Sequence, residues 1–176
     1  SSDYTMGTGD FTVECWAKTD NRTRNHGLFQ ISSSATGVTG TNYQNTIAVG
    51  KTDIVGGGSP AYTWTVYGGN GNSTAPAVTY ENTGQWTHIA LVRSSAVTTL
   101  YANGIKQVSF SDTTDYDGTT VAIGAYYASD YSWDGQISNF RVLKGTALYT
   151  SSFRPPTEPL TSITNTKLLC CNNSST

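Results

Sequence analysis

Apolar and polar residues alternate with a period of two along most of the chain, which is the pattern of half-buried β-strands. The stretch FTVECWAKT at residues 11–19 places Phe11, Val13, Cys15 and Ala17 on one face and Thr12, Glu14, Trp16 and Lys18 on the other. Successive side chains of a strand point to opposite sides of a sheet, so the first face is expected to be buried. By the same reasoning Phe11, Phe29, Trp86 and Phe140 are predicted core residues.

Similar stretches recur at intervals of about 8–12 residues, a spacing typical of sandwiches and barrels. Ten strands are predicted, over residues 11–19, 27–32, 46–50, 62–68, 86–94, 98–104, 105–110, 119–127, 135–144 and 166–171. Asn103-Gly104 between two of these runs predicts a tight hairpin, because both residues tolerate positive φ. The one helical feature expected is a short turn within residues 146–153.

The composition agrees with this strand pattern and limits the function. The chain has 176 residues with 18 Gly and 11 Tyr, and charged residues make up 12%. We predict one all-β domain, a two-sheet antiparallel jelly-roll sandwich over residues 1–171, followed by a flexible tail at 172–176. A net charge of −2 argues against a nucleic-acid or anionic-membrane binder that works by bulk charge. No stretch is long and apolar enough for a membrane-spanning helix.

Four segments carry a family resemblance. They are GDFTVECW at 9–16, QWTHIALVR at 85–93, TLYANGIKQ at 99–107 and WDGQISNFRVLKGTALYTSSFRPPT at 133–157. Together they resemble the laminin-G-like branch of the concanavalin A-like lectin/glucanase superfamily. The last segment looks like the closing part of such domains in phage and marine-virus particle proteins. The resemblance implies a jelly roll that binds glycans or proteins. It also implies an opening strand that is missing here or lies upstream of residue 1.

Glycoside hydrolysis needs two carboxyl groups held across the scissile bond. Glucanases of the superfamily that the chain resembles place them on one strand face as E-x-D-x-x-E or E-x-D-x-E, and neither spacing occurs. Glu14, Glu81 and Glu158 stand far apart, and Glu14 is predicted to lie on a solvated strand face. His88 is predicted to be a structural, hydrogen-bonded residue and His26 an exposed one. The chain is therefore predicted not to be an enzyme, with a glycan hydrolase as the distant alternative.

An acidic turn at residues 111–120 is a candidate metal site. Asp112, Asp115 and Asp117 fall within six positions and are followed by Gly118. Calcium binds six to eight oxygen ligands on flexible loops, and carboxylates are its usual protein ligands. The alternative is a set of Asx turns, in which aspartate side chains bond their own backbone. No cofactor is predicted to be required, and Ca²⁺ is the one candidate ion.

Aromatic and acidic residues gather in the stretch AYYASDYSWDG at 125–135. The candidate ligand-binding residues are Tyr126, Tyr127, Tyr131 and Trp133 for stacking, with Asp130 and Asp134 for sugar hydroxyls or a calcium ion. Sugar rings present apolar C–H faces that stack on aromatic rings. The alternatives are core packing and a subunit interface, since aromatic residues are enriched in both.

The three cysteines leave their pairing open. Cys15 lies in the first predicted strand and Cys170-Cys171 in the last, so one bridge from Cys15 to either is geometrically allowed if the strands are neighbours. The alternative is three free thiols that pack as small apolar residues. An odd number of cysteines without Cys-x-x-Cys spacing gives no support for a zinc site.

These features together predict a recognition module on the surface of a phage or virus particle that binds cell-surface carbohydrate. Such a protein would be extracellular and part of an oligomer or larger assembly, without nucleic-acid binding or membrane insertion. The alternative is a structural protein that decorates a capsid or fibre and binds no glycan. In that case the edge left by a missing strand would accept a strand from a neighbour.

Overall fold

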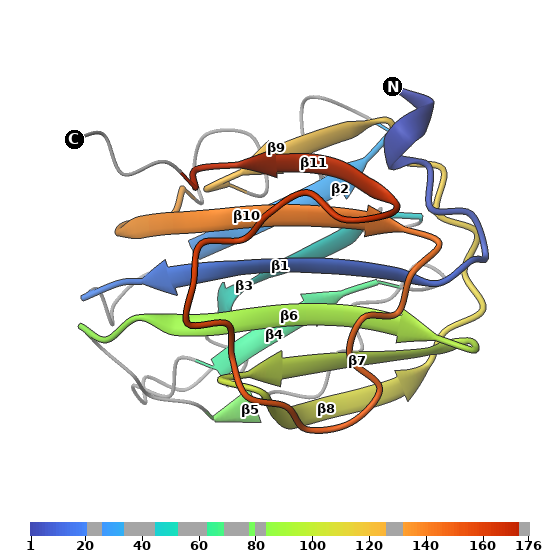
Figure 1. The fold of residues 1–176 in the computed structure, drawn as a ribbon. Helices are drawn as coiled ribbons and strands as arrows, with labels where there is room; N and C mark the ends of the chain where they lie inside the picture. The colour runs from blue at the N-terminus through green and yellow to red at the C-terminus, as the bar shows by residue number, and fades with distance from the viewer. Residues whose placement is uncertain are drawn as a thin grey trace.

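The computed structural model describes residues 1–20, 26–33, 45–52, 63–68, 78–79, 84–125 and 132–172. They form two antiparallel β-sheets packed face to face (Figure 1). The first sheet has the order β11-β10-β1-β6-β7-β8, from β1 (Phe11–Lys18), β6 (Thr87–Ser94), β7 (Val97–Ala102), β8 (Ile105–Ser111), β10 (Gln136–Lys144) and β11 (Thr166–Cys170). The second has the order β5-β4-β3-β2-β9, from β2 (His26–Ser32), β3 (Ile47–Thr52), β4 (Thr63–Tyr67), β5 (Val78–Thr79) and β9 (Thr120–Ile123). The predicted all-β sandwich is confirmed.

The hydrophobic core fills the space between the two sheets. Phe11, Val13, Cys15 and Ala17 of β1 all belong to it, as their alternation predicted. Phe29 of β2 meets Phe140 of β10 edge to face at 5.6 Å between ring centroids, which joins the two sheets across the core. A 3₁₀-helix, η1 (Ser2–Tyr4), and the two-residue strand β5 were not predicted, because neither is long enough to show a period.

The predicted hairpin at Asn103-Gly104 is confirmed between β7 and β8. Asn103 has φ 49° and Gly104 has φ 74°, so both central residues adopt the left-handed region that a two-residue type I′ turn requires. The side chain of Asn103 accepts a hydrogen bond from the backbone N–H of His88, at 2.9 Å. This contact fixes the hairpin against the start of β6.

Residues 145–165 form a long connection between β10 and β11, which we call the strap. In Figure 1 it leaves β10, crosses the outer face of the six-stranded sheet to the β7–β8 hairpin, and returns to β11. Ala147, Tyr149 and Phe153 of the strap pack on a second apolar cluster of Ala90, Val92 and Tyr101. The prediction of a helical turn within 146–153 is wrong, because backbone N–H groups of the strap donate hydrogen bonds to the sheet and its hairpin and not to one another. Phe153 N, for example, donates to Gly104 O at 3.0 Å.

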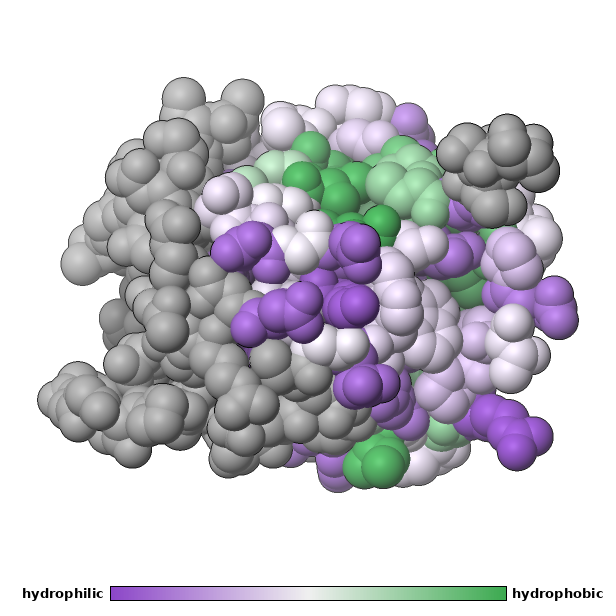
Figure 2. All heavy atoms as spheres, turned by 90° about the vertical axis from the view of Figure 1, so that its left-hand side faces the viewer, coloured by the Kyte–Doolittle hydropathy of each residue, from purple (hydrophilic) through white to green (hydrophobic). Residues whose placement is uncertain are grey.

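The strands β9 and β11 are the outermost described strands of the two sheets on the same side of the molecule (Figure 1). Val121, Ile123, Leu168 and Cys170 on these strands are half-buried against the core. The end view in Figure 2 shows a hydrophobic area, in green, toward this side of the sandwich. Strand addition at such an edge stays a prediction. The part of the chain that the structure describes contains no helix long and apolar enough to span a membrane.

Candidate functional site

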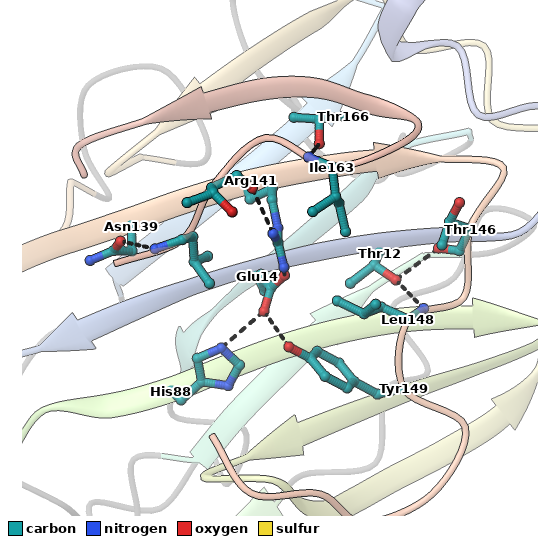
Figure 3. A network of polar contacts seen from close by, with 12 residues as sticks. Thr12, Glu14, His88, Asn139, Arg141, Thr146, Leu148, Tyr149, Ile163 and Thr166 are labelled. Carbon is teal, nitrogen blue, oxygen red and sulfur yellow. Dashed lines mark hydrogen bonds and ion pairs between the residues drawn. The ribbon is translucent and has the colours of Figure 1, made fainter. Parts of the chain in front are cut away.

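A buried polar cluster fixes the strap to the outer face of the six-stranded sheet (Figure 3). Its centre is Glu14 of β1, whose side chain has no exposed surface. One carboxylate oxygen accepts hydrogen bonds from Arg141 Nε at 2.9 Å and Nη2 at 2.5 Å. The other accepts a hydrogen bond from the Tyr149 hydroxyl at 2.8 Å and lies 3.1 Å from His88 Nε2. The prediction that Glu14 is solvated is therefore wrong, and the structural role predicted for His88 is confirmed.

The charge of Glu14 is stabilised by its partners. Burial alone raises the pKa of a carboxyl group, but the hydrogen bond from His88 and the charge of Arg141 outweigh it, so the pKa of Glu14 is lowered. Burial and the neighbouring Glu14 charge raise the pKa of Tyr149, which keeps its hydroxyl a donor. Glu14, His88 and Arg141 are buried, Tyr149 is half-buried, and the side chains of all four contact one another, so we assign the cluster to folding and not to ligand binding.

Further hydrogen bonds tie both ends of the strap to the sheet, as Figure 3 shows. Thr12 Oγ1 donates to Thr146 O at 2.8 Å and accepts a hydrogen bond from Leu148 N at 2.9 Å. Arg141 Nη1 donates to Thr161 O at 2.8 Å near the other end. Hydrogen bonds to the sheet thus hold the strap in place near both of its ends.

An open groove of about 430 Å³ lies where the returning part of the strap meets the sheet. It is lined by Trp16, Trp86, Ser138, Asn139, Pro156, Thr157, Glu158 and Pro159. This volume falls in the range of small-molecule sites, which combine apolar walls with a few placed polar groups. Trp86 is 43% exposed, so its predicted place in the core is wrong. Trp16 is half-buried, and its ring meets His88 edge to face at 5.3 Å.

A β-bulge gives the groove its polar wall. One residue of β1 separates Glu14 from Trp16, but two residues of β10 separate their partners Arg141 and Ser138. The bulge puts Asn139 at φ 53°, a conformation that asparagine tolerates better than most residues. Asn139 Oδ1 accepts a hydrogen bond from Leu160 N at 2.7 Å, and Asn139 Nδ2 donates to Ser138 Oγ at 2.9 Å. The bulge therefore joins the strap to the sheet at the rim of the groove.

The aromatic and acidic stretch predicted to bind ligand is placed in part. Tyr126, Tyr127, Asp130 and Tyr131 lie outside the described residues. Asp134 is exposed, as a ligand contact requires.

Trp133 lies in the core, where its ring stacks on Trp64 at 5.8 Å and its Nε1 donates to Lys18 O at 3.2 Å. The expectation that Trp133 offers an exposed stacking face is therefore corrected. The ring of His26 packs edge to face on Trp133, and His26 is 1% exposed, so the prediction of an exposed His26 is wrong.

The acidic turn does not bring its three carboxylates together. Asp112 is buried, and it accepts hydrogen bonds from Thr98 Oγ1 at 2.6 Å and Tyr116 OH at 2.9 Å, with Arg93 Nη1 at 3.9 Å. Asp115 and Asp117 are exposed. Among the described residues, which include all three aspartates, no group of three His, Cys, Asp or Glu side chains could hold a metal ion. The predicted calcium site is corrected here, because Asp112 already binds hydroxyl donors beside a guanidinium group.

Sequence reasoning missed the groove for two reasons. Trp86 directly precedes a strongly apolar strand and was assigned to its buried pattern. Trp16 was correctly placed on the outer face of its strand, but no local signal showed that the strap leaves this residue partly uncovered. Trp16 lies on the outer face of β1, and Trp86 directly precedes β6, the strand that pairs with β1. This pair of tryptophans is the signal that could have predicted the site.

The chain belongs to the concanavalin A-like lectin/glucanases superfamily, because a laminin-G-like family model of that description matches residues 1–148. A search of curated proteins returns no match.

Solved structures similar to the chain include a putative carbohydrate binding protein from Bacteroides ovatus, at 22% identity and a TM-score of 0.56 over 81% of this chain and 39% of that one. They also include the CBM40 of a Ruminococcus gnavus sialidase bound to sialyllactose, at 17% identity and a TM-score of 0.55 over 82% of this chain and 80% of that one. The enzymatically active domain of tailspike protein 2 from bacteriophage CBA120 matches at 13% identity and a TM-score of 0.55, over 81% of this chain and 23% of that one. At these identities the likeness is one of fold.

Proposed function

We propose that this domain is a non-catalytic carbohydrate-binding module and that the groove beside Trp16 and Trp86 holds the sugar. The observation that carries the proposal is the exposed indole of Trp86, which lines one groove with the half-buried ring of Trp16. Covering an exposed indole ring with a ligand removes a large apolar area from water, which favours binding. Two similar structures support this proposal, the carbohydrate binding protein from Bacteroides ovatus and the CBM40 that is bound to sialyllactose.

The groove offers both kinds of contact that a sugar needs. Its two indole rings provide flat apolar surface for the C–H face of a pyranose ring. The hydroxyls of Ser138 and Thr157 and the carboxylate of Glu158 provide donors and acceptors around it. Because Asn139 fixes the Ser138 hydroxyl through a 2.9 Å hydrogen bond, part of this polar wall is preorganised.

The same groove argues for binding without hydrolysis. Glycosidases use two carboxyl groups about 5–9.5 Å apart. Glu158 is the one carboxylate among the described residues that line the groove, and Glu14 nearby is buried under the strap by Arg141 and Tyr149. A hydrolase active site would need a second acid that this part of the structure does not supply.

The setting we favour for this module is the surface of a phage or virus particle. The likeness to a bacteriophage tailspike supports this setting at the level of fold. In that setting Tyr126, Tyr127, Asp130, Tyr131 and Asp134 would extend the contact with a cell-surface glycan. If a calcium ion takes part, we propose that it bridges these acidic residues and the hydroxyl groups of the glycan.

Trp86→Ala tests the groove, because the variant removes the exposed ring without touching the core. A glycan array on the wild-type protein identifies the ligand, and isothermal titration calorimetry then measures its affinity for each variant. We expect Trp86→Ala to weaken binding roughly tenfold or more, as loss of an aromatic contact residue usually does.

Ile105→Ala is the matched control. Ile105 is 59% exposed and does not line the groove, so its loss should leave affinity unchanged. Two results would overturn the proposal: no glycan bound with or without calcium, or equal affinity for the wild type and Trp86→Ala. Release of reducing sugar by the wild type, abolished in Glu158→Gln, would restore the hydrolase alternative.

A further inference from the structure

The last residue of strand β11, Cys170, and the residue that follows it, Cys171, hold their sulfur atoms close together. Cys170 Sγ and Cys171 Sγ lie 3.7 Å apart. Cys171 is exposed and Cys170 is half-buried, and both are free thiols. The third cysteine, Cys15, is fully buried in the core on β1. The two sulfur atoms therefore form an accessible dithiol separate from the core thiol.

The separation of the two sulfur atoms matches the geometry of a chelate. Two sulfur atoms bound to one ion at about 2.3 Å each lie about 3.3 Å apart when the angle at the ion is near 90°, as at pyramidal trivalent arsenic, and about 3.8 Å apart when it is tetrahedral. A disulfide between the same residues is less favourable, because neighbouring Cα atoms are about 3.8 Å apart and disulfides usually need 4.4–6.8 Å. The arrangement of the two cysteines therefore favours binding one ion through both sulfur atoms over forming a disulfide with each other.

The backbone holds the pair in this arrangement. Cys171 has φ 58°, and its carbonyl oxygen accepts hydrogen bonds from Asn139 N at 2.8 Å and Ser138 Oγ at 3.2 Å. These donors belong to the bulge of β10, so the sheet itself fixes the turn that brings the second sulfur beside the first. A chelate that is already formed loses less conformational freedom when it binds a ligand.

We propose that Cys170 and Cys171 form a bidentate dithiol site for one soft, thiophilic ion of the class that includes trivalent arsenic. In the binding step two S–H bonds break and two bonds from sulfur to the ion form. With phenylarsine oxide as the ligand, both thiol hydrogens leave with the oxygen of the As=O group as one water molecule. Arsenic remains trivalent, so the step needs no oxidant or reductant.

Phenylarsine oxide tests the site in the folded protein. Native mass spectrometry of the reduced chain should show one C₆H₅As group in place of two hydrogens. The adduct should survive a large excess of a monothiol and be removed by a small dithiol, because two bonds to one protein give a high effective concentration. In Cys170→Ser and Cys171→Ser the adduct should dissociate at least tenfold faster under the monothiol challenge.

Cys15→Ala is the matched control, and it should keep the adduct because the Cys15 thiol is buried. The proposal is overturned if the wild-type chain forms no monothiol-resistant adduct, or if Cys171→Ser keeps one. Loss of the adduct in a folded Cys15→Ala protein would also overturn the proposal, because that result would show that Cys15 is one of the two thiols that bind arsenic. Glycan binding does not enter any of these measurements, so the outcome is independent of the proposed function.

Discussion

The outer face of the six-stranded sheet is covered in one half and open in the other, although the same strands build both halves. Along β1, Thr12 and Glu14 have no exposed surface, whereas Trp16, two residues further along the same face, is half-buried beside the groove. The first half carries polar residues that hydrogen-bond to the strap. The second carries a large aromatic ring that borders a space of about 430 Å³.

The difference lies in what covers the strands and not in the strands themselves. Under the strap, every charge of the Glu14 cluster has a partner inside the protein, as a buried charge requires. At the groove, the apolar ring of Trp86 and the hydroxyls around it face outward. Under the proposed function, stability and recognition are divided between two neighbouring parts of one surface, and each can be changed separately.

The largest effect is expected for Glu14→Ala, which removes the centre of the covered half. Arg141 and His88 would be left buried without their carboxylate, and breaking a buried pair in this way costs about 3–5 kcal/mol. Urea denaturation followed by tryptophan fluorescence measures the free energy of unfolding. A loss below about 1 kcal/mol would contradict the view that this cluster holds the strap in place.

Glu14→Gln provides the pH control for the same cluster. The pKa of Glu14 is lower in the folded protein than its ordinary value of 4.5, so its charge contributes fully above the unfolded pKa. That contribution is lost as the pH falls through the lower folded pKa. The stability advantage of the wild type over Glu14→Gln should therefore shrink between about pH 6 and about pH 3. A constant difference over this range would show that the ionised form is not favoured by folding.

Gly104→Ala should cause the next largest loss of stability, because the strap packs closely against the β7–β8 hairpin at Gly104. A Cβ at Gly104 would lie 1.8 Å from Phe153 O, a distance that forces the strap to move. Gly145→Ala is the control, since Gly145 also has positive φ, at 80°, but a Cβ there meets nothing within 4 Å. We expect a loss of about 1 kcal/mol for Gly145→Ala from backbone strain alone. Gly104→Ala should lose clearly more, and equal losses would rule out tight contact between strap and hairpin.

The two halves also differ in how far the sequence predicts them. Alternation on β1 correctly placed Phe11 and Val13 in the core, because a sheet with one apolar face must bury it. The strap has no period, so its path could not be derived from local pattern. Glu14 was misassigned to solvent because its partners Arg141 and Tyr149 lie 127 and 135 residues away. Without the strap, neither the burial of Glu14 nor the exposure of the groove can be inferred.

The smallest effect is expected for Tyr149→Phe, which removes one hydrogen bond and keeps the packing. The ring of Tyr149 stacks on Phe153 at 3.6 Å, and phenylalanine would keep this contact. The variant loses the 2.8 Å hydrogen bond from the hydroxyl to Glu14, and a hydrogen bond to a charged group contributes about 1.5–3 kcal/mol. We expect a loss near the lower end, because Arg141 and His88 still contact the carboxylate.

A double-mutant cycle with Glu14→Gln isolates this contact. If the hydroxyl acts through the charge of Glu14, Tyr149→Phe should cost less in the Glu14→Gln background than in the wild type. Additive losses would show that the hydroxyl stabilises the strap by another route. The affinity of the groove for its proposed glycan should stay unchanged in Tyr149→Phe, because Tyr149 belongs to the part of the strap that packs on the covered half of the sheet and does not line the groove. A parallel loss of affinity would instead show that the covered half sets the shape of the open one.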